Sequence, residues 1–394
     1  KADETLSLST TKNSKASEHQ IFKKARDFAE AVVAPRSILW ERESGFDRET
    51  LRDAAKLGLI GLQVPATHGG LGLPFSAKTK LAEILAGADF GFAMSVMIGV
   101  NVAFKLTRDT SSKVVNRYLS DLLTTKRLAS VALTEPQAGT DFSSISMSAV
   151  RTDDGWVLNG EKSWIVNGAE SDLIIVFAQT EPGSRGAGIA AFLVDGRREG
   201  FTRTSLVGIP GQTSIGVGGF VLKDYCARND ELMLPAGTAF KNILNDINGA
   251  RTYVAAMCCG MMNSAIRIVT DYGQSRQTFG RALSQHQGWG WSLAEAEIDL
   301  TAARLLVKDA AARIDDGANC RFEAAQAKVF ATRMALRHIP ALCHLMGAEG
   351  LRNFYPFGRH MTGARISGLV DGTTEILLEA LAGRHRMKQG GNRK

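Results

Sequence analysis

The first third of the chain carries an apolar residue at every third or fourth position, which is the spacing of one helix face. This pattern starts at Ile21, predicts a helix end at Pro35 and continues in further segments to about Leu128. Residues 1–15 are rich in Ser, Thr and Lys and lack the period, so we expect a frayed tail there. We expect an N-terminal α-helical domain at 16–128.

From about Ser130 the apolar period falls to two, which is typical of strands. Three dipeptides that favour hairpin turns separate the first short strands: Asp154-Gly155, Asn159-Gly160 and Asn167-Gly168. Further short strands are expected at 173–178, 189–194 and 220–222. The pattern predicts a middle antiparallel β sandwich or barrel at 129–239.

The helical period returns after Ala239 and lasts to the end of the chain. One apolar series with this spacing is Trp291, Ala294, Ile298, Ala302 and Leu305. We expect a C-terminal bundle of about four helices at 240–394. The predicted fold class is therefore mostly α with a central β domain.

Composition narrows the setting of the protein without naming an activity. The 394 residues include 47 Lys and Arg against 40 Asp and Glu, a net charge of +7 that favours anionic ligands. Five cysteines without zinc-site spacing predict reduced thiols, no metal and a cytoplasmic location. No charged segment followed by an apolar run opens the chain, but it begins at Lys1, so a removed targeting segment stays an open alternative.

The longest apolar run, Phe90 to Phe104, is shorter than the roughly 20 residues that a membrane-spanning helix needs. We expect a buried helix there and no membrane span. Residues 155–163 resemble a phosphate-binding loop, but Glu161 interrupts the motif and its glycines sit where hairpin turns need them. No G-x-G-x-x-G follows a strand, so a Rossmann nucleotide site is disfavoured.

Four other segments are unusual in combination and in this order. They are Ala132-Leu-Thr-Glu-Pro-Gln-Ala-Gly-Thr-Asp141, Gly160-Glu-Lys-Ser-Trp-Ile-Val-Asn-Gly168, Arg276-Gln-Thr-Phe-Gly-Arg-Ala-Leu-Ser-Gln-His-Gln287 and Val370-Asp-Gly-Thr-Thr-Glu-Ile376. In a helix, sheet and helix chain of this length, they resemble the acyl-CoA dehydrogenase family of FAD enzymes. The resemblance covers roughly residues 20 to 388.

The resemblance implies an FAD site built from several segments. The residues that it implies are Leu133, Thr134, Gly139, Thr140, Trp164, Val166, Arg276, Phe279, Gln287, His344, Gly347, Thr373 and Glu375. Of these, Arg276, Phe279 and Gln287 are implied to reach the FAD of a neighbouring subunit in a homotetramer or homodimer. Without the resemblance, the 132–141 loop reads as structural, Trp164 as a core residue and Arg276 as a solvated charge.

Two of the positions implied to bind FAD depart from the family pattern. Val166 stands where a Thr usually approaches the flavin, and His344 stands where Gln is usual. His344 can still donate a hydrogen bond to phosphate or ribose. We therefore expect FAD binding to be retained, and leave the oxygen reactivity of the flavin open.

The resemblance also implies a carboxylate that removes the proton α to a thioester carbonyl while hydride leaves the β carbon. Asp371 occupies that position in place of the usual Glu, one methylene shorter, and the alternative family position holds Ala250. A displacement of about 1 Å at a reacting group can cost on the order of 10²-fold in rate. Gly372 and Arg251 are implied to contact the substrate, although Arg251 could instead pair with Asp246.

The leading hypothesis is an FAD-dependent dehydrogenase of an acyl thioester carried by coenzyme A or an acyl carrier protein. An electron-transfer flavoprotein or another acceptor would reoxidise the flavin. The alternatives are an oxygen-using oxidase or monooxygenase of the same fold, and a binding protein whose basic residues 384–394 hold nucleic acid. The positive charge is too dispersed to favour nucleic acid as a partner.

Overall fold

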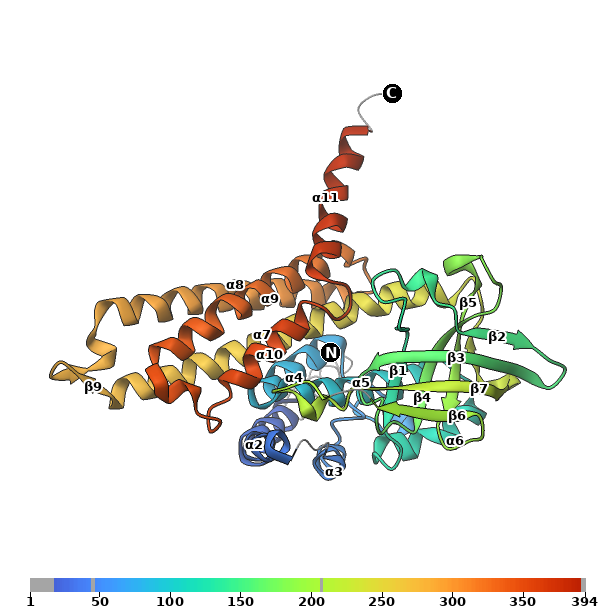
Figure 1. Ribbon diagram of the computed structural model, residues 1–394, viewed down its shortest axis with the longest axis horizontal. Helices are drawn as coiled ribbons and strands as arrows, with labels where there is room; N and C mark the ends of the chain where they lie inside the picture. Colours follow the sequence, from blue (N-terminus) through green and yellow to red (C-terminus); the bar gives the residue numbers. More distant parts are fainter. Residues whose placement is uncertain (1–17, 44–46, 206–207, 391–394) are drawn as a thin grey trace, which may run out of the picture.

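The computed structural model describes residues 18–43, 47–205 and 208–390, with side chains up to residue 384. Helices of the first third pack against a long helical bundle, and a twisted sheet lies at one end of that bundle (Figure 1). The predicted fold class is confirmed. The predicted tail at 1–15 and the side chains of the basic C-terminal tail after Arg384 lie outside the described residues. The limits of the three domains stay a prediction.

The first predicted helix end is wrong. Helical residues 18–28 continue through the π turn η1 (Ala29–Val33) into α2 (Ala34–Glu43), so the helix passes Pro35. In the π turn the amide of Ala34 donates to the carbonyl of Ala29, five residues back. Pro35 follows this wider turn inside the continuous helix, and the π turn accommodates a residue that has no amide hydrogen to donate to the preceding turn.

The other N-terminal helices are α3 (Arg48–Lys56), η2 (Ala66–His68), α4 (Phe75–Ala88), α5 (Phe90–Asp109) and α6 (Ser112–Leu123). Helix α5 contains the predicted apolar run and is mostly buried, as expected. Helices α5 and α7 (Ala239–Ser275) are long and apolar enough to span a membrane by length and composition. Because 72% and 83% of their apolar windows are buried in the fold, we interpret both as core helices.

The sheet has eight strands: β1 (Ala129–Ala132), β2 (Ser148–Arg151), β3 (Gly155–Ile165), β4 (Leu173–Gln179), β5 (Ile189–Asp195), β6 (Phe201–Ser205), β7 (Gly218–Arg228) and β8 (Leu232–Leu234). Short 3-10 turns connect them: η3 (Phe142–Ser144), η4 (Arg185–Gly188), η5 (Thr213–Ile215) and η6 (Asn229–Glu231). The strand order is β6-β7-β3-β2-β4-β5-β8, and β1 also pairs with β4. Most pairs are antiparallel as predicted, but β4 runs parallel to both β1 and β2, which makes the sheet mixed.

Two of the three predicted hairpin turns are wrong. Asn167-Gly168 is a turn, but it connects β3 to β4, which do not pair with each other. Asn159-Gly160 lies inside the continuous strand β3. The pairing of β3 with β7 shifts register at this point, which marks a β-bulge. Gly160 has φ +144°, and a Cβ there would lie 2.8 Å from the Cα of Met147. The glycine therefore permits a close approach of two backbone segments and does not form a turn.

A buried ion pair anchors the loop between β1 and β2. The Nζ atom of Lys162 on β3 lies 2.8 Å from Glu135 Oε1 and donates to the Leu133 carbonyl at 2.9 Å. Glu135 also accepts from the amides of Ser146 and Met147, at 2.7 and 2.9 Å. Burial lowers the pKa of Lys162 to about 8, although Glu135 opposes that shift. Both ends of the loop are thus bound to one buried carboxylate and its lysine.

The C-terminal third consists of α7, β9 (Gln277–Thr278), β10 (Arg281–Ala282), η7 (Leu283–Gln285), α8 (Gln287–Asp315), α9 (Arg321–Leu345), η8 (Gly347–Leu351), α10 (Phe357–Ser367) and α11 (Thr374–Gly390). Helices α7, α8 and α9 run side by side as the long bundle, and α11 projects from it (Figure 1).

The apolar series that predicts α8 lies on the exposed side of the helix. Trp291, Ile298 and Leu305 are 62%, 67% and 62% exposed, and their spacing of seven residues places them along one ridge. The buried face carries smaller residues such as Ala296 and Ala303. The helix is as predicted, but its large apolar face has no partner within the described residues.

The buried ion pair gives a test of how the β1–β2 loop is held. We expect Lys162→Met to lower the free energy of unfolding by about 3–5 kcal/mol, because Glu135 keeps a buried charge without its partner. The measurement is urea unfolding of the purified protein. In the double variant Lys162→Met with Glu135→Leu, part of that loss should be recovered. A single variant as stable as the parent would contradict this account.

Candidate active site

Asp371 lies in the short connection between α10 and α11, on an unusual backbone. Asp371 has φ +54° and the following Gly372 has φ +93°, so two successive residues are left-handed. A left-handed conformation is unfavourable for a non-glycine residue and persists only where surrounding contacts hold it. The contacts that hold this connection come from two basic side chains.

Arg251 of α7 and Lys328 of α9 bind three consecutive carbonyl groups of this connection. Arg251 Nε donates to the Asp371 carbonyl at 3.0 Å. Lys328 Nζ donates to the carbonyls of Val370 and Gly372, the latter at 2.6 Å. We call residues 370–372 with these two cations the clamped loop.

The clamp also orients the amides of the loop. In a trans peptide the N–H points away from the preceding C=O. Because the carbonyls of residues 370–372 point at the cations, the amides of residues 371–373 point the other way. No backbone acceptor for these amides occurs among the described residues. They are free to donate to a ligand.

The Asp371 carboxylate is set in an environment that favours its neutral form. Burial raises its pKa, while the charges of Lys328 and Arg251 oppose the rise. No hydrogen-bond donor to this carboxylate occurs within the described part of the chain. Burial in turn lowers the pKa of Lys328 to about 8 and lowers the pKa of Arg251. The arrangement suits a group that must accept a proton near neutral pH.

Asp246, the alternative partner of Arg251, is occupied elsewhere. Asp246 pairs with Lys105 and lies 3.3 Å from Arg108, both on α5. Arg251 instead donates to Asn248 at 3.0 Å as well as to the clamped loop. The structure therefore places Arg251 beside Asp371, as the resemblance implies.

A second group of predicted residues gathers where β1 and β3 end. Trp164 is left-handed (φ +59°) and 61% exposed, so it is a surface side chain and not a core residue. The amide of Ser163 donates to the Thr134 carbonyl at 3.1 Å, which sets Trp164 next to the loop. Leu133 and Val166 bind Lys162 and Ser130 through their carbonyls.

The polar groups of this loop are available to a ligand. Gly139 and Thr140 are exposed, and Thr134 is partly exposed. The Thr134 and Thr140 hydroxyls have no hydrogen-bond partner among the described residues. An exposed indole beside two unpartnered hydroxyls fits a flat ring with polar edges, such as the isoalloxazine of FAD.

Thr373 and Glu375 lie at the start of α11, next to the clamped loop. Two amides that could have bound phosphate here already have acceptors in the chain: Thr374 donates to Gly368 at 3.1 Å, and Ile376 donates to the Thr373 hydroxyl at 3.4 Å. The amides of Thr374 and Ile376 are therefore not free to bind phosphate. Glu375 is exposed.

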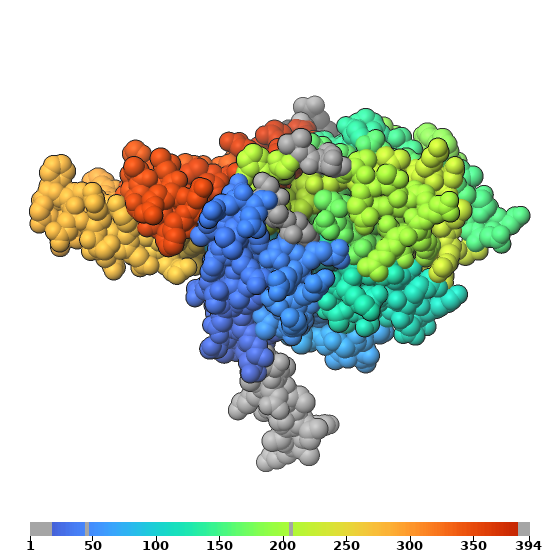
Figure 2. All heavy atoms as spheres, turned by 60° about the horizontal axis from the view of Figure 1, so that its bottom comes forward, coloured from blue at the N-terminus to red at the C-terminus, as the bar shows by residue number. Residues whose placement is uncertain are grey.

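The remaining predicted residues lie at the far end of the helical bundle. Arg276, Gln287, His344 and Gly347 are exposed, and Phe279 is 97% exposed. Figures 1 and 2 show the segments around residues 280 and 345 projecting together, away from the sheet. One chain therefore does not bring this group to Trp164.

Sequence reasoning missed the buried basic residues that hold both loops. Lys328 has Ala324, Ala331 and Thr332 as buried neighbours on α9. A lysine on the apolar face of a core helix is a signal that could have been noticed. Lys162 stands in the 160–168 segment, but nothing in that segment indicates that its side chain is buried.

Comparisons with known proteins agree with this arrangement. Models of the acyl-CoA dehydrogenase N-terminal, middle and C-terminal domains match residues 15–126, 130–225 and 238–385. An acyl-CoA dehydrogenase of Bacillus subtilis (strain 168) is 30% identical over 361 residues, which are 90% of this chain and 94% of the relative. A short-chain specific acyl-CoA dehydrogenase of Megasphaera elsdenii is 29% identical over 377 residues, 93% of this chain and 97% of the relative.

The fold comparison gives the same result. The solved butyryl-CoA dehydrogenase of Megasphaera elsdenii has a TM-score of 0.89 and 29% identity, covering 93% of this chain and 97% of that one. The chain therefore belongs to the acyl-CoA dehydrogenase family, the FAD-dependent oxidoreductases that act on CH–CH bonds.

Proposed function

We propose that this protein dehydrogenates an acyl-CoA between its α and β carbons, with Asp371 as the base that removes the α proton. The observation that carries this proposal is the clamped loop, which presents a carboxylate without donors beside free amides. A carboxylate whose pKa is raised by burial is a stronger base than an exposed one.

The free amides supply the second requirement of the reaction. Removing an α proton places negative charge on the thioester oxygen, which needs donors fixed in advance. The amides of Asp371 and Gly372 point away from the clamping cations and would donate to this oxygen. Asp371 would thus accept the proton while its own loop stabilises the developing charge.

FAD, when bound, would supply the two-electron acceptor for the hydride that leaves the β carbon. Trp164 and the Thr134 and Thr140 hydroxyls would hold its ring system, with Leu133, Gly139 and Val166 shaping the loop. Thr373 and Glu375 would approach the cofactor from α11. An electron-transfer flavoprotein is the acceptor that we propose for reoxidation. The oxygen-using alternative is not favoured, because the relatives reported above are dehydrogenases.

We propose that the cofactor site is completed by a second copy of the chain, in a homotetramer or homodimer. Two observations support this. The group of Arg276, Phe279, Gln287, His344 and Gly347 lies exposed at the far end of the bundle, away from Trp164 (Figure 2). The ridge on α8 leaves large apolar side chains exposed, as an interface between subunits requires.

The base is tested by Asp371→Asn in anaerobic stopped-flow reduction of the bound flavin by butyryl-CoA. We expect the reduction rate to fall by about 10²–10⁴-fold, because the amide cannot take the proton. FAD content should be unchanged. Asp371→Glu should keep a larger part of the rate than the Asn variant. The matched control is Asp153→Asn in the exposed β2–β3 turn, and an Asn variant at parental speed would refute the role of Asp371.

The acid side of the pH profile reports the state of the same carboxylate. The base acts when ionised, so the reduction rate should rise with pH through its pKa. Because burial raises that pKa, the rise should lie above the pH at which an exposed carboxyl, of pKa about 3.9, titrates. Lys328 opposes the shift, so Lys328→Met should move the rise to higher pH. A rate that falls as the pH rises through this range would exclude a carboxylate base.

Subunit association is tested on the α8 ridge with Ile298→Asp. A charge on this apolar ridge should lower the oligomer mass in light scattering and, together with it, the FAD content. Thr152→Asp, which adds the same charge in the exposed β2–β3 turn, is the control. An Ile298→Asp protein with parental mass would show that the ridge is no interface.

A further inference from the structure

A polar cluster is buried where α4, α5 and α7 meet. It consists of Lys78 on α4, Asn101 and Lys105 on α5, and Asp246 and Tyr253 on α7. Buried charges in proteins are normally paired. Lys105 is paired with Asp246, but Lys78 has no carboxylate partner among the described residues.

Lys78 is 3% exposed and forms no ion pair with a carboxylate among the described residues. Its ammonium group donates to Asn101 Oδ1 and lies 4.9 Å from the ring centroid of Tyr253 and 5.4 Å from that of Phe75. Burial lowers its pKa to about 7. One amide oxygen and two ring faces are weak compensation for a buried cation.

The charge balance around the cluster leaves Lys78 as the excess cation. Asp246 is shared by Lys105 and Arg108, and Arg108 also binds Asp109 at 2.6 Å. The two carboxylates are those of Asp246 and Asp109. The three cations are Lys105, Arg108 and Lys78. An additional anion would complete the balance at Lys78.

Several hydrogen-bond donors converge at the same place without an acceptor. An ammonium group has three N–H donors, and Asn101 is the only acceptor for Lys78 among the described residues. The Tyr253 hydroxyl accepts from Asn101 at 3.3 Å but donates to none of the described residues. Lys78 and the Tyr253 hydroxyl therefore both carry hydrogen-bond donors that have no acceptor among the described residues.

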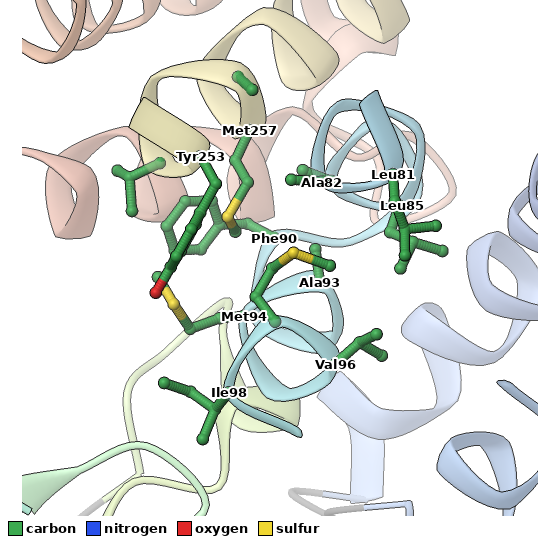
Figure 3. Packing of buried hydrophobic residues seen from close by; sticks show 14 of the residues in the cluster. Leu81, Ala82, Leu85, Phe90, Ala93, Met94, Val96, Ile98, Tyr253 and Met257 are labelled. Atoms are coloured by element: carbon green, nitrogen blue, oxygen red, sulfur yellow. The ribbon is translucent and has the colours of Figure 1, made fainter. Parts of the chain in front are cut away.

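The cluster and the base contact the same segment of α7, because Arg251 holds the Asp371 carbonyl and Tyr253, two residues further on, lies against Lys78. The pKa of Tyr253 is raised by burial and also by the charge of Asp371. Figure 3 shows Tyr253 pointing from α7 toward Met94 of α5, with Ile98 one turn further along that helix. The Tyr253 side chain therefore has apolar neighbours on α5 and the Lys78 ammonium group against its ring.

We propose that Lys78, assisted by the Tyr253 hydroxyl, binds a carboxylate at the far end of the acyl chain, so that the substrate is the monothioester of a short dicarboxylic acid. The inference rests on the proposed function and names its substrate class. A simple fatty acyl chain would leave its last methyl group against a buried cation, which is unfavourable.

The experiment compares matched thioesters in anaerobic reduction of the bound flavin: glutaryl-CoA with pentanoyl-CoA, and adipoyl-CoA with hexanoyl-CoA. In the parent we expect at least one dicarboxylic thioester to reduce the flavin with a second-order rate constant about tenfold or more above that of the monocarboxylic thioester of equal length. Lys78→Met should lower the rate constant for the dicarboxylic thioester by about tenfold or more. The rate constant for the monocarboxylic thioester should change by less than about threefold. Lys80→Met, an exposed lysine on the same helix, is the control.

The possible failures are distinct. If the monocarboxylic thioesters react as fast as the dicarboxylic ones or faster, the carboxylate site is excluded while the dehydrogenase function stands. If no thioester reduces the flavin, the proposed function itself fails. If Lys78→Met does not fold, the parent's preference still decides, and Tyr253→Phe should weaken it.

Discussion

Buried Lys328 and partly buried Arg251 bind three consecutive carbonyl groups ahead of the last helix, and the proposed active site depends on this contact. Lys328 and Arg251 come from different helices, so the loop position is fixed by the packing of α7 against α9. Left-handed backbone at Asp371 costs on the order of 1–3 kcal/mol, which charge-assisted hydrogen bonds can offset. The same contacts turn the amides of the loop outward and leave the carboxylate without donors. The same contacts of Lys328 and Arg251 therefore position both the proposed base, Asp371, and the amides that would stabilise the thioester oxygen.

The loop between β1 and β2, where we propose that the flavin binds, is organised in a related way. Lys162 donates to a backbone carbonyl and to Glu135, which in turn accepts two amides from the end of the loop. In both places a lysine is surrounded by apolar side chains, and burial lowers its pKa to about 8. Such a cation persists because nearby oxygens replace its hydration. The groups that would meet ligands, Trp164 and Asp371, are therefore held in place by buried lysines that would not touch those ligands.

Much of the fold could be predicted because helices and strands place apolar residues at different spacings along the sequence. The errors have local causes. Pro35 is accommodated by a π turn, and Asn159-Gly160 serves a β-bulge, since the same residues suit several backbone shapes. The period of α8 identified a helix with a large apolar face but could not tell which molecule covers that face. At the site, motif resemblance picked out Asp371, but Lys328 binds backbone carbonyls, and a carbonyl leaves no trace in the sequence.

The central claim is that the Asp371 carboxylate takes the α proton of the thioester. The most direct measurement is exchange of the α hydrogens of a bound, non-oxidisable acyl-CoA analogue with deuterated solvent, followed by proton NMR. The account predicts exchange in the parent holoenzyme and loss of exchange in Asp371→Asn at equal analogue occupancy. Exchange at the parental rate in that variant would contradict it, because another group would then be removing the proton.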